Sequence, residues 1–200
     1  RKGNGYSSDV LAGISWVLER KEQLGIRILN ISVGACSKRG MSENSALVKG
    51  VNRAWDAGLV VVVAAGNNGP RTMSITTPGI SRKVITVGCS DDDREVLVGG
   101  NRMVDYSGRG PTAACICKPD LVAPGCSVVS CSSRADKYTI KSGTSMSTPI
   151  VSGAVALLLE RFPDMSNKDV KLRLRESSVD IGLPRNQQGW GLLDVGKMIG

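Results

Sequence analysis

The fold is decided by the segment Leu59 to Ala64 (LVVVVA), an almost purely aliphatic run of the chain. Such runs are typical of parallel strands whose two faces are both covered. A second buried strand is predicted at 26–33. Between the two strands lies a helical pattern that Ser42 would cap and Gly58 would end. This order of strand, helix and strand predicts a doubly wound α/β fold, with a mostly parallel sheet and helices on both faces.

The same signals define the other elements. The further predicted elements are a helix over 10–18 that is capped within 7–9 and ended by Gly25, a strand at 84–88, a hairpin over 95–106 that turns at 99–101, strands at 126–131 and 138–141, a helix over 144–161, and a last helix whose capping box is formed by Ser166 and Asp169. No repeat, linker or low-complexity tract interrupts the pattern. We therefore expect residues 1–200 to form one domain.

Composition excludes several classes of protein. The 200 residues carry a net charge of +8, but basic and acidic residues are spread over both halves and the chain has one Phe and three Tyr. The spread of charge and the scarcity of aromatic residues argue against nucleic-acid binding, which needs concentrated charge and aromatic rings. The positive net charge favours an acidic partner or an acidic segment. No apolar run approaches the length of about 18 residues that a membrane span requires. The chain opens on Arg1 with no visible secretory leader, so residue 1 is not expected to be a native start.

The six cysteines indicate in which cellular compartment the protein is expected. They are scattered, form no Cys-x-x-Cys pair and have no histidine beside them, so no zinc or other metal site is predicted. In a chain with an ample core, scattered thiols favour a reducing compartment, and we expect a cytoplasmic rather than a secreted protein. A disulfide between Cys126 and Cys131 remains the alternative.

The candidate nucleophile is Ser145, within Gly143 to Pro149 (GTSMSTP) at the start of the predicted helix 144–161. A serine in a first helical turn places its oxygen beside backbone N–H groups at the positive end of the helix dipole. Those donors suit a developing oxyanion. The alternative is that Ser145 only caps the helix. The esterase pattern G-x-S-x-G does not fit, because position 147 is Ser.

A second candidate segment is Ala64 to Pro70 (AAGNNGP), at the carboxyl end of the aliphatic strand. Ligands of α/β sheets bind at that edge. Asn67 offers an amide donor there, and Gly66 would let a substrate backbone come close. The alternative is an ordinary turn, because Asn, Gly and Pro commonly form turns.

Together these segments resemble the subtilisin-like serine proteases, the subtilases. The nucleophile and oxyanion motifs of that family correspond to 143–157 and 64–67, and three further family motifs follow the same order along the chain. Those three motifs lie at 30–34 (NISVG), 118–125 (KPDLVAPG) and 189–195 (GWGLLDV). The resemblance covers most of the chain and implies a subtilisin-like α/β sheet.

The resemblance also implies roles for individual residues. Ser145 would attack the scissile carbonyl, and Asn67 with the Ser145 N–H would hold the oxyanion. The substrate backbone would pair with Ser32, Val33 and Gly34. Ala64, Ala65 and Gly66 would line the pocket for the side chain before the cut. These small residues favour polypeptide substrates with apolar side chains and a broad profile.

The family places its catalytic Asp and His before the Ser in the chain, whereas this chain has no histidine. Its start resembles the part of the family that follows the His motif. We therefore expect a sheet that is incomplete at its N-terminal side, a chain inactive by itself, and self-association or a bound N-terminal partner along the open edge. Family members often bind calcium, but the resemblance places that loop upstream, so no cofactor is expected here. A pseudoprotease or peptide-binding module that retains the groove remains the alternative function.

Overall fold

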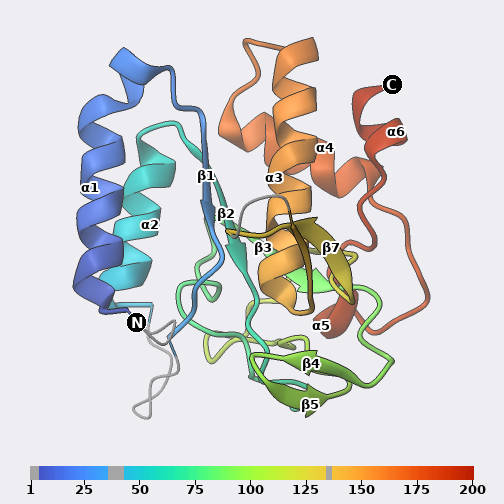
Figure 1. Cartoon of the computed structure of the whole chain (residues 1–200). Helices are drawn as coiled ribbons and strands as arrows, with labels where there is room; N and C mark the ends of the chain where they lie inside the picture. The colour runs from blue at the N-terminus through green and yellow to red at the C-terminus, as the bar shows by residue number, and fades with distance from the viewer. Residues whose placement is uncertain (1–4, 36–42, 134–136) are drawn as a thin grey trace.

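The computed structural model describes residues 5–35, 43–133 and 137–200 of the chain. Four strands form one sheet in the order β1-β2-β3-β6, and every neighbouring pair is parallel (Figure 1). The strands are β1 (Ile28–Ile31), β2 (Val60–Ala64), β3 (Ile85–Cys89) and β6 (Leu121–Ala123). Within the described ranges, β1 lies at one edge of this sheet.

Helices cover both faces of the sheet, which confirms the predicted fold class. Helix α3 (Thr144–Arg161) contacts all four strands. Helix α2 (Ala46–Asp56) packs against β2 on the opposite face of the sheet, and α1 (Ser7–Leu24) packs against the outer side of α2 (Figure 1). The remaining elements are α4 (Asn167–Ser177), α5 (Arg185–Gln188), α6 (Val195–Ile199) and two antiparallel hairpins, β4 (Val96–Val98) with β5 (Asn101–Met103) and β7 (Val128–Cys131) with β8 (Tyr138–Lys141).

The core explains why the aliphatic run is a central strand. Every residue of β2 and β3 is buried. Val151, Val155 and Leu158 of α3 are also fully buried in the same cluster. Because both faces of β2 are covered, its sequence shows no alternation of polar and apolar residues.

Two predicted helix caps are wrong. Helix α1 begins at Ser7 with Tyr6 as its N-cap and without a side-chain cap, so the polar residues at 7–9 lie inside the helix. Helix α2 is capped by Ser45 rather than Ser42, because Ser45 directly precedes the helix and its Oγ accepts the Val48 N–H at 3.3 Å. Ser42 itself lies outside the described residues.

Other boundaries are confirmed. Gly25 ends α1 with a φ of +60°, α3 spans the predicted 144–161, and Ser166 and Asp169 form the capping box of α4. The predicted strand 26–33 is shorter, because only 28–31 pairs with β2. Strand β6 was not predicted, because its three residues lie between two prolines in a segment too short to show a pattern.

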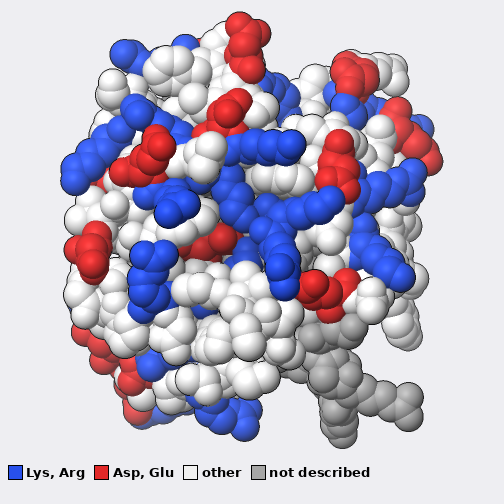
Figure 2. All heavy atoms as spheres, turned by 180° about the vertical axis from the view of Figure 1, so that it is seen from behind, with Lys and Arg blue, Asp and Glu red and all other residues white. Residues whose placement is uncertain are grey.

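The disulfide that the sequence left open is not formed. All five cysteines in the described part of the chain are free thiols: Cys89, Cys115, Cys117, Cys126 and Cys131. The sixth, Cys36, lies outside the described residues. In the same ranges, no helix combines the length and the apolar character that crossing a membrane requires. Lys and Arg side chains gather across the middle of the face opposite to that of Figure 1, with acidic side chains scattered among them (Figure 2).

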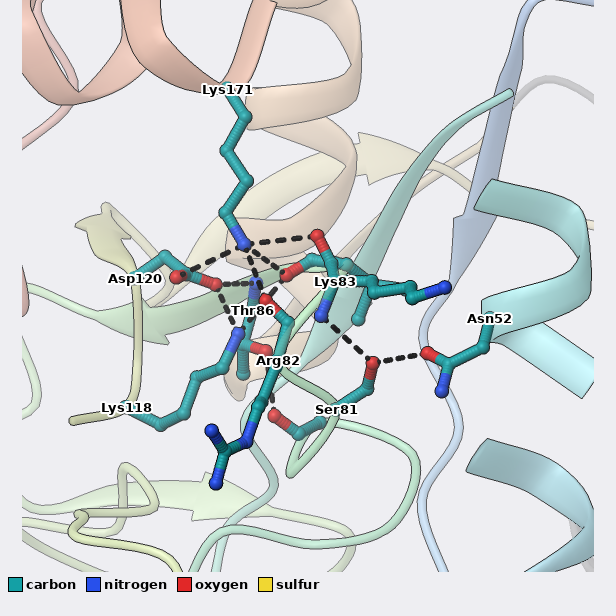
Figure 3. A network of polar contacts seen from close by, with 10 residues as sticks. Asn52, Ser81, Arg82, Lys83, Thr86, Lys118, Asp120 and Lys171 are labelled. Carbon is teal, nitrogen blue, oxygen red and sulfur yellow. Dashed lines mark hydrogen bonds and ion pairs between the residues drawn. The ribbon is translucent and has the colours of Figure 1, made fainter. Parts of the chain in front are cut away.

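A buried cluster of charges joins the start of β3, the segment before β6 and α4 (Figure 3). The Lys118 ammonium, 1% exposed, pairs with Asp120 Oδ2 at 2.5 Å and donates to the Val84 carbonyl at 3.0 Å. Asp120 Oδ2 also accepts the Thr86 N–H at 2.7 Å, and its Oδ1 lies 3.5 Å from Lys171 Nζ. Burial lowers the pKa of Lys118 to about 8, although the pairing with Asp120 opposes this shift. One carboxylate therefore stabilises two ammonium groups inside the fold.

Candidate active site

Ser145 is the second residue of α3 and is half-buried. The preceding residue Gly143 has a φ of +139° and is the N-cap of the helix, a backbone conformation that strongly favours glycine. Within the described residues, no acceptor is found for the Ser145 N–H. Such a first-turn N–H lies at the positive end of the helix dipole, so it is free to bind an oxyanion.

Asn67 lies beside Ser145 because Thr144 holds it there. The Thr144 backbone N–H and hydroxyl donate to Asn67 Oδ1 at 3.0 and 2.9 Å. A backbone N–H can only donate, so the oxygen of the amide must face Thr144 and the NH₂ group must point elsewhere. Thr144 Oγ1 in turn accepts the Gly66 N–H at 3.1 Å. Thr144 was not predicted as a site residue, although its place beside Ser145 in the motif could have indicated a role.

The segment after β1 contacts Ser145 directly. Ser145 Oγ donates to the Ser32 carbonyl at 2.8 Å, and farther along α3 the Ser152 hydroxyl donates to Asn30 Oδ1 at 2.9 Å. These two contacts hold α3 across the end of β1. The carbonyl of Ser32 accepts the hydroxyl hydrogen of Ser145 but cannot act as a base at neutral pH.

Thr76 separates two of the predicted site glycines. A Cβ added to Gly34 would lie 2.4 Å from Thr76 Oγ1, and a Cβ added to Gly66 would lie 2.4 Å from Thr76 Oγ1 and Cγ2. The Thr76 side chain is itself buried, and its hydroxyl donates to the Ala65 carbonyl at 3.3 Å. Only glycine fits on either side of this side chain. Thr76 was not predicted as a site residue, because α2 and β2 separate it from Gly34 in the chain.

The other predicted site residues differ in exposure. Val33 is 53% exposed and, with Gly34, lines a hollow of about 280 Å³ that also reaches Val10 of α1. Ala64 and Ala65 are buried, so their methyl groups face the protein interior. The backbone of Ala65 is engaged as well, because its N–H donates to the Val87 carbonyl and its carbonyl accepts the Thr76 N–H, both at 2.9 Å.

The described residues contain no cluster of metal-binding side chains. No group of three or more His, Cys, Asp or Glu side chains lies close enough together there to hold a metal ion. The whole chain contains no histidine. The site therefore combines the Ser145 hydroxyl with the Ser145 N–H and the NH₂ group of Asn67.

Comparison with known proteins agrees with this geometry. The chain is 37% identical over 195 residues to the serine protease AprX of Bacillus subtilis, covering 89% of this chain and 44% of that protein. It is 33% identical over 195 residues to subtilisin DY of Bacillus licheniformis, covering 96% and 62%. Such relatives do not favour the cytoplasmic location expected from the cysteines.

The fold is shared with solved structures. Sphericase superposes with a TM-score of 0.78 at 31% identity, covering 96% of this chain and 65% of the other. The chain thus spans about half to two thirds of the length of the relatives it matches. Residues 1–191 match the sequence profile of the Subtilase family. The chain therefore belongs to the subtilase family of serine proteases.

Proposed function

We propose that this chain supplies the nucleophile and the oxyanion donors of a subtilisin-type serine endopeptidase. The observation that carries the proposal is the double donation from Thr144 to Asn67 Oδ1. This arrangement leaves the Asn67 NH₂ group and the Ser145 N–H as free donors beside one hydroxyl. Donors arranged before the reaction stabilise the charge that develops on the carbonyl oxygen.

In this mechanism Ser145 Oγ attacks the carbonyl carbon of a polypeptide and forms an acyl-enzyme that water later hydrolyses. The attack requires a base to take the serine proton, and this chain has no histidine. In subtilisin, a member of this family, losing the histidine alone lowers kcat about 10⁶-fold. We infer that the 200 residues by themselves are inactive and that a segment outside them supplies the base and its orienting carboxylate.

The substrate would bind along 32–34 as an added strand. Val33 is exposed and Gly34 opens onto the hollow beside it, which supports an extended peptide at this edge. The backbone of 64–66 would form part of the wall around the side chain that precedes the cut. No charged side chain is among these residues, so we expect broad acceptance of apolar side chains. A peptide library that shows strict selection for Arg or Lys would contradict this.

The test is labelling with a fluorophosphonate probe, which traps activated serines. The 200-residue chain is compared with a longer chain that includes a histidine-bearing segment, and the adduct is located by peptide mass spectrometry. We expect rapid labelling of Ser145 only in the longer chain, and its loss in Ser145→Ala but not in Ser147→Ala. Equal labelling of the 200-residue chain would contradict the need for an outside base. A longer chain that binds peptides without labelling would favour the alternative, a peptide-binding module.

A further inference from the structure

A second hollow, of about 360 Å³, lies on the surface beside α4. Its lining residues are Trp55, Lys168, Lys171, Leu172, Arg175 and Trp190. Three of the six are basic and none is acidic. We call these six residues the tryptophan groove.

Lys171 has a structural role in the tryptophan groove and is not available to bind a ligand there. Its ammonium lies 5.7 Å from the ring centroid of Trp55 and 5.9 Å from that of Trp190, so it holds both rings at one place. The same ammonium donates to the carbonyls of 82, 83 and 84 at 2.9 to 3.0 Å (Figure 3). Its hydrogen-bonding capacity of three donors is therefore filled.

Lys168 and Arg175, in contrast, are free. Both are exposed, and neither forms an ion pair or hydrogen bond with any residue in the described ranges. Asp169, the acidic neighbour of Lys168, is engaged with Ser166 in the capping box. The two cations are seven positions apart, which is about two turns or ~10 Å along the helix.

An apolar surface lies between these cations. Leu172 is 52% exposed, and Trp190 is partly exposed beside it. A peptide in the polyproline II conformation advances about 3.1 Å per residue with three residues per turn, so two acidic side chains three positions apart lie on the same side of it, ~9 Å apart. An apolar side chain between them would meet Leu172 and Trp190.

From this match we propose that the tryptophan groove binds an acidic polypeptide segment with the pattern acidic, apolar, any residue, acidic. The net charge of +8 and the basic side chains gathered on the face in Figure 2 would attract such a segment over longer distances. A nucleic acid fits less well. Trp55 is only 6% exposed, so it offers no open ring face for a base.

The experiment measures fluorescence anisotropy of a labelled peptide, Gly-Glu-Leu-Ala-Glu-Gly, titrated with the 200-residue chain. The double variant K168Q/R175Q should weaken binding about tenfold or more, because two charge-assisted contacts are lost. The matched control K137Q/K141Q removes the same charge from β8 and the residue just before it, and should bind like the unchanged chain. Circular dichroism and thermal unfolding establish that each variant remains folded.

Changes in the peptide and in the salt concentration test whether charge at the groove is responsible for binding. A peptide with Gln in place of both Glu residues should bind at least about tenfold more weakly, and added salt should weaken binding of the acidic peptide. Absence of binding by the acidic peptide would overturn the proposal. Equal weakening in the two double variants would overturn it as well, since net charge rather than the groove would then be responsible. Tighter binding of a twelve-residue oligothymidylate or of phosphatidylserine vesicles than of the peptide would also overturn it.

Discussion

Thr144 donates twice to one oxygen of Asn67, through its backbone N–H at 3.0 Å and its hydroxyl at 2.9 Å. The same hydroxyl oxygen accepts the Gly66 N–H. Thr144 thus sets the orientation of the amide through both its backbone and its side chain, and its hydroxyl holds the loop that carries Asn67. The orientation of Asn67 therefore depends on the residue that precedes Ser145.

Replacing Thr144 by Val keeps the shape but removes the hydroxyl. We expect kcat of the histidine-bearing longer chain to fall about tenfold, less than the 10²–10³-fold seen in subtilisin when the amide itself is lost, because the Thr144 N–H still orients it. Steady-state kinetics on a peptide substrate measure this, with Thr148→Val as the control. A change in KM with kcat unaltered would contradict an orienting role.

Replacing Asp120 by Asn should destabilise the fold strongly. The change leaves Lys118 buried without its counter-ion and weakens the support of Lys171, so we expect a loss of about 3–5 kcal/mol in the free energy of unfolding. Asp56→Asn is the matched control, because Asp56 pairs with Lys83 on the surface and should cost at most about 1 kcal/mol. Urea unfolding measures both. Equal losses would show that burial of the Lys118 pair is unimportant.

The buried Lys118 should also make stability depend on pH. Its pKa in the folded chain is lowered from 10.5 to about 8 by burial. The unfolded chain therefore binds the proton more tightly than the folded chain between pH 8 and 10.5, and stability rises with pH over that range. Relative to Lys118→Met, the unchanged chain should gain about 1–3 kcal/mol between pH 8 and 10.5. A difference that is flat over this range would contradict the lowered pKa.

Ser147→Ala should stabilise the chain. Ser147 is completely buried in α3, and its Oγ has no hydrogen-bond partner among the described residues. Removing this hydroxyl relieves a desolvation cost of about 1 kcal/mol. Ser177→Ala is the control, because that hydroxyl donates to the Arg173 carbonyl at 2.7 Å and its loss should destabilise α4 by about 1 kcal/mol. Thermal unfolding should move the two melting temperatures in opposite directions.

The thiols should differ in reactivity. Cys115, Cys117 and Cys131 are exposed, whereas Cys89 is buried and burial raises its pKa to about 12. Because the thiolate is the reacting form, iodoacetamide at pH 8 should modify the three exposed cysteines well before Cys89, as followed by peptide mass spectrometry. Denaturation without a reductant should reveal six thiols. A count of four or fewer would point to a disulfide.

The sequence predicted the elements whose signals are local. The aliphatic run of β2 and the motif around Ser145 carry their own evidence, so the parallel sheet and the start of α3 were placed correctly. Strand β6 was missed because three residues show no period. Thr76 was missed for another reason: its contact with Gly34 joins segments far apart in the chain, and such a pairing leaves no trace in a single sequence.

The position of Thr76 between two glycines has a consequence for engineering this site. The segment expected to bind substrate and the loop that carries Asn67 are separated by the width of one side chain. A larger residue at Gly34 or Gly66 must push the two segments apart unless Thr76 is replaced by a smaller residue at the same time. Variants that change the distance between these two segments should therefore carry replacements both at a glycine and at position 76. Libraries that randomise one position at a time will rarely contain them.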